Sequence, residues 1–477
     1  MSDYLAVVPL VCVWLGGIAA MMAEAFRSRG ERMPIAGLGI VGLIAAGTTS
    51  VLLWDRNAVS FGVVTADNFG LFVQLVLVLV GILTLALSAQ IVERDGINAG
   101  EYYALTLFGL GGMMLMAIAN DLLVIFIALE ILSLAVYILT AIRRESREGA
   151  EAAFKYFLLG GFSSAFFLYG IAFTYGIAGT TKLDRIAVVM SSQSAGNEIL
   201  TYLAMGLLLV GFAFKVSAVP FHMWTPDAYQ GAPAVVTAFM SAGVKAAAFA
   251  AFVRVFLSAF GTLQPQWEPV VWMLSATSMI LGAVAGVVQR NVRRMLAYSS
   301  IAHAGYLLMA MAAGNDVGKG AILFYLLTYA ITSVGAFGVT ALVATRDGAN
   351  DDLSDYAGLS RRQPLLALLM TIFLLSLGGF PPTAGFIGKW YLFNAAVSAG
   401  DYALAIIGVL SSVVSVYFYL RVVVMMYMSD ETSMAPVTEP TAASMFALAV
   451  PTAGIFYLGL MPTRVLELAI KSIATIL

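Results

Sequence analysis

The stretch that decides the fold is GFAFKVSAVPFHMWTPDAYQGAPAVVTAFMSAGVKAAAFAAF, residues Gly211–Phe252. Two lysines, Lys215 and Lys245, each lie in the middle of an apolar run. Between them, prolines and glycine interrupt the helical pattern, beginning at Pro220. An ionised side chain at the centre of a bilayer costs about 2.5–3.5 kcal/mol. A broken helix between two buried ammonium groups therefore predicts a functional site inside a membrane.

The composition is that of a membrane protein. Of 477 residues, 61% are hydrophobic and 11% are charged, and the mean hydropathy is +0.92, whereas soluble domains carry about 25% charged residues. In lipid a helix satisfies all of its own backbone hydrogen bonds, so the predicted fold class is all-α, a polytopic helical bundle. The net charge of −2 does not indicate nucleic-acid binding.

The cysteine and histidine content limits the chemistry of the chain. Cys12 is the single cysteine, which excludes an internal disulfide and an all-cysteine iron–sulfur cluster. The two histidines, His222 and His303, are too few to suggest a haem or zinc site. We therefore expect no metal and no bound cofactor in this chain.

Apolar runs that are long enough to span a bilayer predict about fourteen membrane helices. They cover Tyr4–Ala25, Met33–Trp54, Phe69–Ile91, Tyr102–Ala119, Leu122–Ile142, Ala152–Tyr175, Ile199–Pro220, Ala234–Leu257, Val270–Val288, Met295–Ala313, Gly320–Val343, Pro364–Asn394, Tyr402–Tyr427 and Ser444–Met461. The last residues, Thr463–Leu477, predict a short interfacial helix.

The distribution of basic residues predicts the orientation, because cytoplasmic loops are enriched in Lys and Arg. The loops after predicted helices 1, 3, 5, 9 and 11 hold most of them, namely Arg27, Arg29, Arg32, Arg94, Arg143, Arg144, Arg147, Arg290, Arg293, Arg294, Arg346, Arg361 and Arg362. We expect these loops to face the cytoplasm, and both termini to face the outside or the periplasm.

Two helix breaks suggest an internal duplication. Predicted helix 7 is interrupted at residues 218–221 and predicted helix 12 at residues 378–382. The two helices are five apart, and an odd offset reverses orientation, which predicts inverted repeats of the kind found in transporters. Within one integral membrane domain, 1–477, we expect N-terminal helices 1–3 in 1–95, a first repeat in 101–257 (helices 4–8), an inverted second repeat in 266–428 (helices 9–13), and a C-terminal helix and tail in 440–477.

Four ionisable residues are predicted inside membrane helices: Glu130, Lys215, Lys245 and Lys389. One buried pair is often structural, but three lysines with one central carboxylate leave positive charge unpaired, which packing alone does not require. Burial in general lowers the pKa of a lysine ammonium toward the range in which it exchanges protons. The pattern favours a proton relay.

Polar side chains at helical spacing surround these charges. The stripes are Glu130/Ser133/Tyr137/Thr140, Thr237/Ser241/Lys245, Ser299/His303/Tyr306, Tyr325/Thr328/Thr332 and Ser411/Ser415/Tyr419. Hydrogen bonding between helices explains any single stripe, whereas several stripes on charged helices indicate a hydrated track.

The two histidines and three charged residues near helix ends differ in what they suggest. His303 lies in a polar stripe and is a relay candidate. His222 lies at the break, where it either shuttles protons or satisfies free carbonyls. Asp227 is interpreted as an interfacial residue, and the pair Glu151 and Lys155 as a solvated helix end, with an entry to the track as the alternative.

Three stretches carry a resemblance to a known family: FKVSAVPFHMWTPDAYQGAPAVVTAFMSAGVKAA (214–247), RNVRRMLAYSSIAHAGY (290–306) and GGFPPTAGFIGKWYLF (378–393). They resemble subunit N of bacterial complex I, the NADH–quinone oxidoreductase, an antiporter-like family related to Mrp-type cation/proton antiporters. The resemblance covers nearly the whole chain. The Gln-Phe-Pro-Leu-His-Thr-Trp-Leu-Pro-Asp version usual in the sister subunits is absent.

The resemblance implies a proton-translocating subunit that couples electron transfer from NADH to quinone to proton pumping. In this family Glu130 and Lys215 would form a modulated pair, Lys245 would be the relay, and Lys389 would be the inlet or outlet. NADH, FMN, iron–sulfur clusters and quinone would belong to the parent complex, so this translocase subunit would have no redox centre of its own.

The resemblance also implies partners and a location. The partners would be a neighbouring antiporter-like subunit, small membrane subunits and the lipid bilayer, and the location would be the bacterial inner membrane. An Mrp-type antiporter subunit and a non-pumping structural scaffold remain alternatives. A scaffold would carry its polar residues on outer faces, whereas a pump would gather them in the bundle interior.

Overall fold

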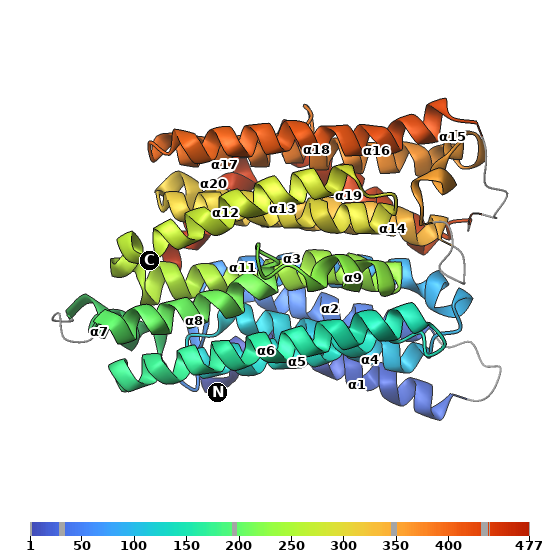
Figure 1. Ribbon diagram of the computed structural model, residues 1–477. Helices are drawn as coiled ribbons and strands as arrows, with labels where there is room; N and C mark the ends of the chain where they lie inside the picture. Colours follow the sequence, from blue (N-terminus) through green and yellow to red (C-terminus); the bar gives the residue numbers. More distant parts are fainter. Residues whose placement is uncertain are drawn as a thin grey trace.

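The computed structural model describes residues 2–27, 34–192, 198–344, 351–430, 437 and 439–476. Over these residues the chain is a bundle of long helices lying side by side, and both termini lie toward the end of the bundle that carries α7 (Leu183–Ser192), on the left in Figure 1. Within them, thirteen helices are long and apolar enough to cross a membrane. The predicted all-α polytopic fold is confirmed.

The first half of the chain contains the N-terminal helices and the first broken helix. A 3₁₀ turn at Ser2–Val7 leads into α1 (Val8–Phe26), followed by α2 (Ile35–Leu52), α3 (Asn68–Arg94), α4 (Ala99–Ile118), α5 (Leu122–Thr140), α6 (Arg147–Ala178), α8 (Glu198–Val216), α9 (Trp224–Gly231), α10 (Ala234–Phe239) and α11 (Lys245–Arg254). A π-helical turn at Met240–Val244 joins α10 to α11, and a second one, Val255–Ala259, follows α11.

The second half has a similar order of elements. It comprises α12 (Gln264–Val287), α13 (Val292–Ala313), α14 (Asp316–Val343), α15 (Leu359–Arg362), α16 (Pro364–Gly378), α17 (Ala384–Ser398), α18 (Tyr402–Met428), α19 (Ala442–Leu460) and α20 (Thr463–Ile473). Short 3₁₀ turns lie at Gly261–Leu263, Leu353–Tyr356 and Ala474–Ile476. The predicted terminal helix is present as α20. Arg29, Arg32 and Arg346, which contribute to the predicted orientation, lie outside the described residues.

Side-chain caps fix where several helices begin. Asp121, Asn291 and Asn315 accept backbone N–H groups in the first turns of α5, α13 and α14. These side chains satisfy amides that have no partner within the helix. The helices that carry Glu130 and His303, α5 and α13, therefore start at positions set by local sequence.

Both predicted helix breaks are present. α8 ends at Val216, where Ser217 adopts a φ of +66°, and the chain resumes as α9 at Trp224. α16 ends at Gly378, where Gly379 adopts a φ of +82°, and α17 begins at Ala384. Proline removes a backbone donor in each break, so neither helix can continue through it. The α16–α17 pair occupies the remaining predicted crossing.

A short β-hairpin and the short helix α7 are absent from the sequence prediction. β1 (Ala58–Ser60) and β2 (Val64–Ala66) form an antiparallel hairpin, and Ser60 accepts the amide of Ala6 at 3.1 Å. Three-residue strands are too short to give a period-2 signal. α7 is too short to span a membrane, so the criterion of long apolar runs does not predict it.

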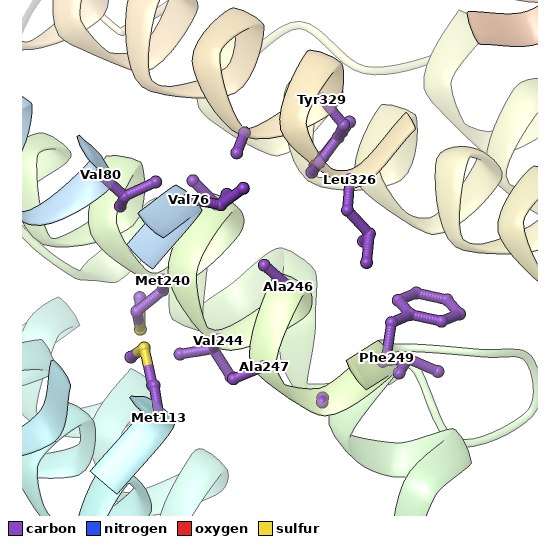
Figure 2. Close-up of a cluster of buried hydrophobic side chains, with 14 of the residues drawn as sticks. Val76, Val80, Met113, Met240, Val244, Ala246, Ala247, Phe249, Leu326 and Tyr329 are labelled. Carbon is purple, nitrogen blue, oxygen red and sulfur yellow. The ribbon is translucent and has the colours of Figure 1, made fainter. Parts of the chain in front are cut away.

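The core lies around the middle of the chain. The span from Ala234 to Ala259 is entirely buried, and α13 and α14 are nearly so, whereas α1, α2, α6, α18 and α19 leave much of their surface uncovered. Figure 2 shows Val76 and Val80, Met113, Met240 and Leu326 packed around the first π-helical turn. Lys245 follows this turn directly, so the most deeply buried helix of the bundle carries an ammonium group.

Candidate functional site

Lys215 lies one residue before the end of α8 and is 3% exposed. Its Nζ donates to Ser133 Oγ at 2.7 Å, and Ser133 Oγ donates to the carbonyl of Leu129 at 2.5 Å. The ammonium also lies 5.7 Å from the ring centre of Tyr137 and 5.5 Å from that of Tyr156. Aromatic faces attract a cation electrostatically, so the charge is held by neutral groups.

Glu130 lies on α5, one helical turn before Ser133, and is half-buried. Ser164 of α6 donates to Glu130 Oε1 at 2.5 Å. No ion pair joins Glu130 to Lys215 in the part of the chain that the structure describes; each has a serine partner instead. A cavity of about 10 Å³, lined in part by Ser164 and Lys215, lies between α5, α6 and α8. That volume is close to the minimum for one water molecule.

Lys245 is 2% exposed and faces α13. Its Nζ donates to both the carbonyl and the hydroxyl oxygen of Ser300 at 2.5 Å. Tyr329 of α14 donates to the same hydroxyl at 2.8 Å, and its ring centre lies 5.4 Å from Lys245 Nζ. This lysine too lies among neutral oxygens and an aromatic ring.

His303 lies in the interior beyond Lys245 and is 2% exposed. Its Nδ1 is 2.5 Å from Tyr325 Oη and its Nε2 is 3.3 Å from Tyr419 Oη. The imidazole is also 5.2 Å from the ring of Tyr329 and 5.5 Å from that of Tyr306, centre to centre. Both ring nitrogens therefore have hydroxyl partners, which is the arrangement a proton-exchanging imidazole needs.

Lys389 lies on α17 and is 4% exposed. Its Nζ donates to Ser412 Oγ at 2.8 Å and to the carbonyl of Gly378 at 3.2 Å. That carbonyl belongs to the last residue of α16, where the helix leaves its carbonyls without partners. The ammonium lies 5.0 Å from the ring centre of Tyr306. The second break thus supplies one of the oxygens that hold the buried charge.

The structure joins three of the six predicted site residues, Lys245, His303 and Lys389, in one row. A buried row of contacts, which we call the central row, runs through Lys245, Tyr329, His303, Tyr306 and Lys389 in that order. Lys215 and Glu130 form a separate group with two serines. The row joins members of two predicted stripes, Lys245 from one and His303 and Tyr306 from the other.

His222 is not part of the central row. It lies between α8 and α9 and is half-buried. Its buried Nδ1 has no hydrogen-bond partner among the described residues. In the part of the chain that the structure describes, His222 has no hydrogen bond to the serines that hold Lys215 and Glu130, and its relay role stays a prediction.

Four contact residues were not singled out from the sequence: Ser164, Ser300, Tyr329 and Ser412. Ser300, Tyr329 and Ser412 each lie beside a predicted polar stripe, whereas Ser164 lies on α6, which carries no predicted stripe. A stripe defines only one face of a helix, whereas a helix between two neighbours uses two faces. Counting Ser and Tyr on every face of the helices next to the charged ones would have found them.

Clusters of metal-ligating side chains and cavities are the places where a bound group would lie. No cluster of three or more His, Cys, Asp or Glu side chains suited to a metal ion occurs over the described ranges. A larger cavity of about 260 Å³ opens between α8 and α12, where Leu209, Phe221 and Trp267 contribute to its largely apolar lining. None of the candidate lysines lines this cavity.

The chain matches known proteins over its whole length. The family model described as NADH:quinone oxidoreductase/Mrp antiporter, TM, matches residues 119–415. NADH-quinone oxidoreductase subunit N of Trichlorobacter lovleyi is 44% identical over 98% of this chain and 97% of that protein. Subunit N 1 of Solibacter usitatus is 41% identical over 100% of this chain and 98% of its own length.

Solved structures agree with the sequence relatives. A chain of respiratory complex I from Thermus thermophilus with bound aureothin superposes with a TM-score of 0.82 at 35% identity, covering 97% of this chain and 99% of its own. A chain of the Mrp complex from Dietzia sp. DQ12-45-1b gives 0.83 at 22% identity, covering 100% and 97%, which shows a shared fold alone. The chain therefore belongs to the subunit N family of NADH-quinone oxidoreductase, within the antiporter-like membrane subunits.

Proposed function

We propose that this subunit carries the protons that complex I pumps along Glu130, Lys215, Lys245, His303 and Lys389. The observation that carries the proposal is the burial of three lysines, none of which has a carboxylate partner among the described residues. Buried lysines held by neutral groups give up protons more readily than ion-paired ones. Lys389 is the inlet or outlet of the route.

The positions of the charges favour a pump over a scaffold. A scaffold needs its polar groups on outer faces, yet Lys215, Lys245 and Lys389 point into the bundle. Tyr156, beside Lys215, has a buried hydroxyl with no hydrogen-bond partner in the described part. Buried polar groups of this kind are commonly satisfied by water, which would complete a proton path.

The two serines beside Glu130 and Lys215 suggest how the first step is driven. Ser164 and Ser133 hold the two charges apart. A unit pair at roughly 4 Å with an effective dielectric constant of 20 gains about 4 kcal/mol. Moving one proton across 100 mV costs about 2.3 kcal/mol. Bringing Glu130 toward Lys215, or releasing it, is therefore a large enough change to load or unload the lysine.

The arrangement of the chain in the complex is part of the same proposal. We infer inverted repeats in 101–257 and 266–428, flanked by 1–95 and 440–477, with the arginine-rich loops cytoplasmic and both termini periplasmic in a bacterial inner membrane. The partners are a neighbouring antiporter-like subunit and small membrane subunits. FMN, the iron–sulfur clusters and the sites for NADH and quinone belong to the rest of the complex. The two α8–α9 and α16–α17 breaks support the repeats.

The test is a Lys215→Ala substitution in the complete complex in membranes. We expect quinone-linked proton pumping to fall strongly, while NADH oxidation with an artificial acceptor stays near wild type, because the redox arm is untouched. Lys319→Ala is the matched control, since Lys319 pairs with Asp316 at the surface. Wild-type pumping in Lys215→Ala would contradict the proposed function.

A further inference from the structure

The short helix α9 lies between the two groups of lysines. At its start, the Trp224 ring stacks on Tyr156 with centres 4.1 Å apart, and Trp224 Nε1 donates to the carbonyl of Phe214 at 3.0 Å. Tyr156 is one of the two rings that face Lys215. The first turn of α9 therefore packs directly against the surroundings of Lys215.

The last turn of α9 approaches the surroundings of Lys245. Tyr229 is 1% exposed and interacts with Ser300, the residue that holds Lys245. The Tyr229 carbonyl also accepts the hydroxyl of Thr237 at 3.0 Å. One rigid helix of two turns thus contacts the shells of both lysines.

Asp227, in the middle of α9, is held by cations from two other helices. Its carboxylate accepts Arg294 Nη1 of α13 at 2.6 Å and Lys155 Nζ of α6 at 3.0 Å. Arg294 also donates to Gln230 Oε1 at 3.2 Å. We call Asp227, Lys155 and Arg294 the α9 clamp; it joins a helix of each half of the bundle to the broken helix.

The neighbouring arginine strengthens the same attachment. Arg293 Nη1 donates to the carbonyl of Ala232, directly after α9, at 2.5 Å, and Arg293 also pairs with Asp351. The consecutive side chains of Arg293 and Arg294, at the start of α13, therefore bind the residue after α9 and α9 itself. The same helix carries Ser300 and His303 further along.

The charge state of Asp227 suits a permanent anchor. Partial burial acts to raise the pKa of its carboxyl, but hydrogen bonds and charge from Arg294 and Lys155 outweigh burial and hold the pKa below its usual value. Asp227 therefore stays ionised at neutral pH. Glu151, which also pairs with Lys155, is the other acidic group in contact with the clamp.

We propose that Asp227 is a positioning residue that, through Lys155 and Arg294, holds α9 in register with both lysine groups and so couples Lys215 to Lys245. The inference rests on the proposed function. It explains why an aspartate in the middle of α9 contacts both halves of the bundle. A solvated helix end requires only water, whereas this carboxylate takes two cations that come from helices far apart in the sequence.

The experiment measures quinone-linked proton pumping per assembled complex, with the amount of complex taken from its artificial-acceptor NADH oxidation. We expect Asp227→Asn to lower pumping about three- to tenfold, which lies within the range for residues that link coupled sites. Asp227→Glu keeps the charge and should retain most activity. Arg294→Gln should give a similar loss, and the double variant should lose no more than the larger single one.

Glu101→Gln is the matched control, because Glu101 forms an exposed ion pair with Arg144 at the same end of the bundle. It should pump as wild type. If Asp227→Asn pumps normally while Lys215→Ala fails, the clamp proposal is overturned and the proposed function stands. If the losses in Asp227→Asn and Arg294→Gln multiply, or Asp227→Glu fails equally, the clamp is structural only. Normal pumping in Lys215→Ala would instead remove the proposed function.

Discussion

At the scale of single residues, each buried lysine is held by hydroxyl or carbonyl oxygens and an aromatic face. A serine hydroxyl accepts a hydrogen bond from each lysine ammonium, namely Ser133, Ser300 and Ser412. Tyrosine rings lie farther from the ammonium groups than these hydroxyls do. A carboxylate in the same place would lock the proton on the lysine, since a close pair of opposite charges favours the ionised forms. Neutral partners leave each lysine able to lose its proton.

Substituting Lys245 by arginine separates charge from proton exchange. Arginine keeps the cation and reaches Ser300, but it does not deprotonate in proteins. We expect Lys245→Arg to assemble normally and to lose quinone-linked pumping by about a hundredfold or more, the lower end of what one proton-transfer group typically contributes. Pumping of vesicles measured with a pH-sensitive dye checks this; wild-type rates would exclude Lys245 from the route.

At the scale of elements, the second break depends on close backbone contact. Gly385, in the first turn of α17, has no room for a side chain, because a Cβ there would overlap with the carbonyl oxygen of Ser376 in α16. The two half-helices can therefore approach only where one of them lacks a Cβ. This contact sets where α17 starts and hence where Lys389 lies.

Gly385→Ala should therefore damage the break. We expect destabilisation of about 3 kcal/mol or more, since backbone must move to make space, together with loss of pumping through displacement of Lys389. Gly161→Ala on α6 is the control, because nothing lies within 4 Å of a Cβ at that position. The thermal unfolding midpoint of the purified complex and its pumping rate are the measurements. Equal midpoints for the two variants would contradict the packing argument.

A buried ion pair fixes the start of α3 against the end of α11. Arg254 contacts both carboxylate oxygens of Asp67 at 2.6 and 2.8 Å, and the two residues are 3% and 4% exposed. Arg254→Met should cost about 3–5 kcal/mol, because it leaves a buried carboxylate unpaired. The double variant Arg254→Met with Asp67→Asn should recover part of this loss. The yield of assembled complex and its thermal unfolding midpoint test this ranking of stabilities. A double variant with a lower midpoint than Arg254→Met would contradict the ranking.

At the scale of the whole molecule, charge and exposure divide the bundle into an interior and a perimeter. The lysines and His303 lie in the interior, whereas α5 and α6 turn Leu134, Ile138, Phe157 and Phe162 outward. Exposed apolar side chains on a membrane-spanning bundle face lipid or neighbouring subunits. Glu130 lies at the edge of this face.

The orientation of the bundle is testable by labelling single cysteines in a Cys12→Ser background. Glu145, between α5 and α6, and Thr262, before α12, are both exposed. With arginine-rich loops in the cytoplasm, Glu145→Cys should react with an impermeant reagent only in inside-out vesicles, and Thr262→Cys only in intact spheroplasts. The opposite pattern would invert the proposed topology.

The sequence by itself determined the class, the crossings and the charged residues of this protein. Apolar runs, prolines at 220 and 381–382, and lysines within the runs follow from composition and spacing, because lipid forces every backbone group into a helix and makes each buried charge costly. Tertiary structure alone decided which neighbours hold those charges. Ser164, Ser300, Tyr329 and Ser412 come from other helices, and helix rotation and depth, which sequence spacing does not fix, bring them into contact.

The same difference applies to the stretch from Gly211 to Phe252. Its two lysines and its helix break can be predicted from the sequence, but the distance between the surroundings of the two lysines cannot. Asp227 reads as an ordinary helix-end residue until Lys155 and Arg294 are found on either side of it. Long-range ion pairs depend on packing between segments far apart in the chain, so only the folded bundle shows that α9 links the two lysine groups.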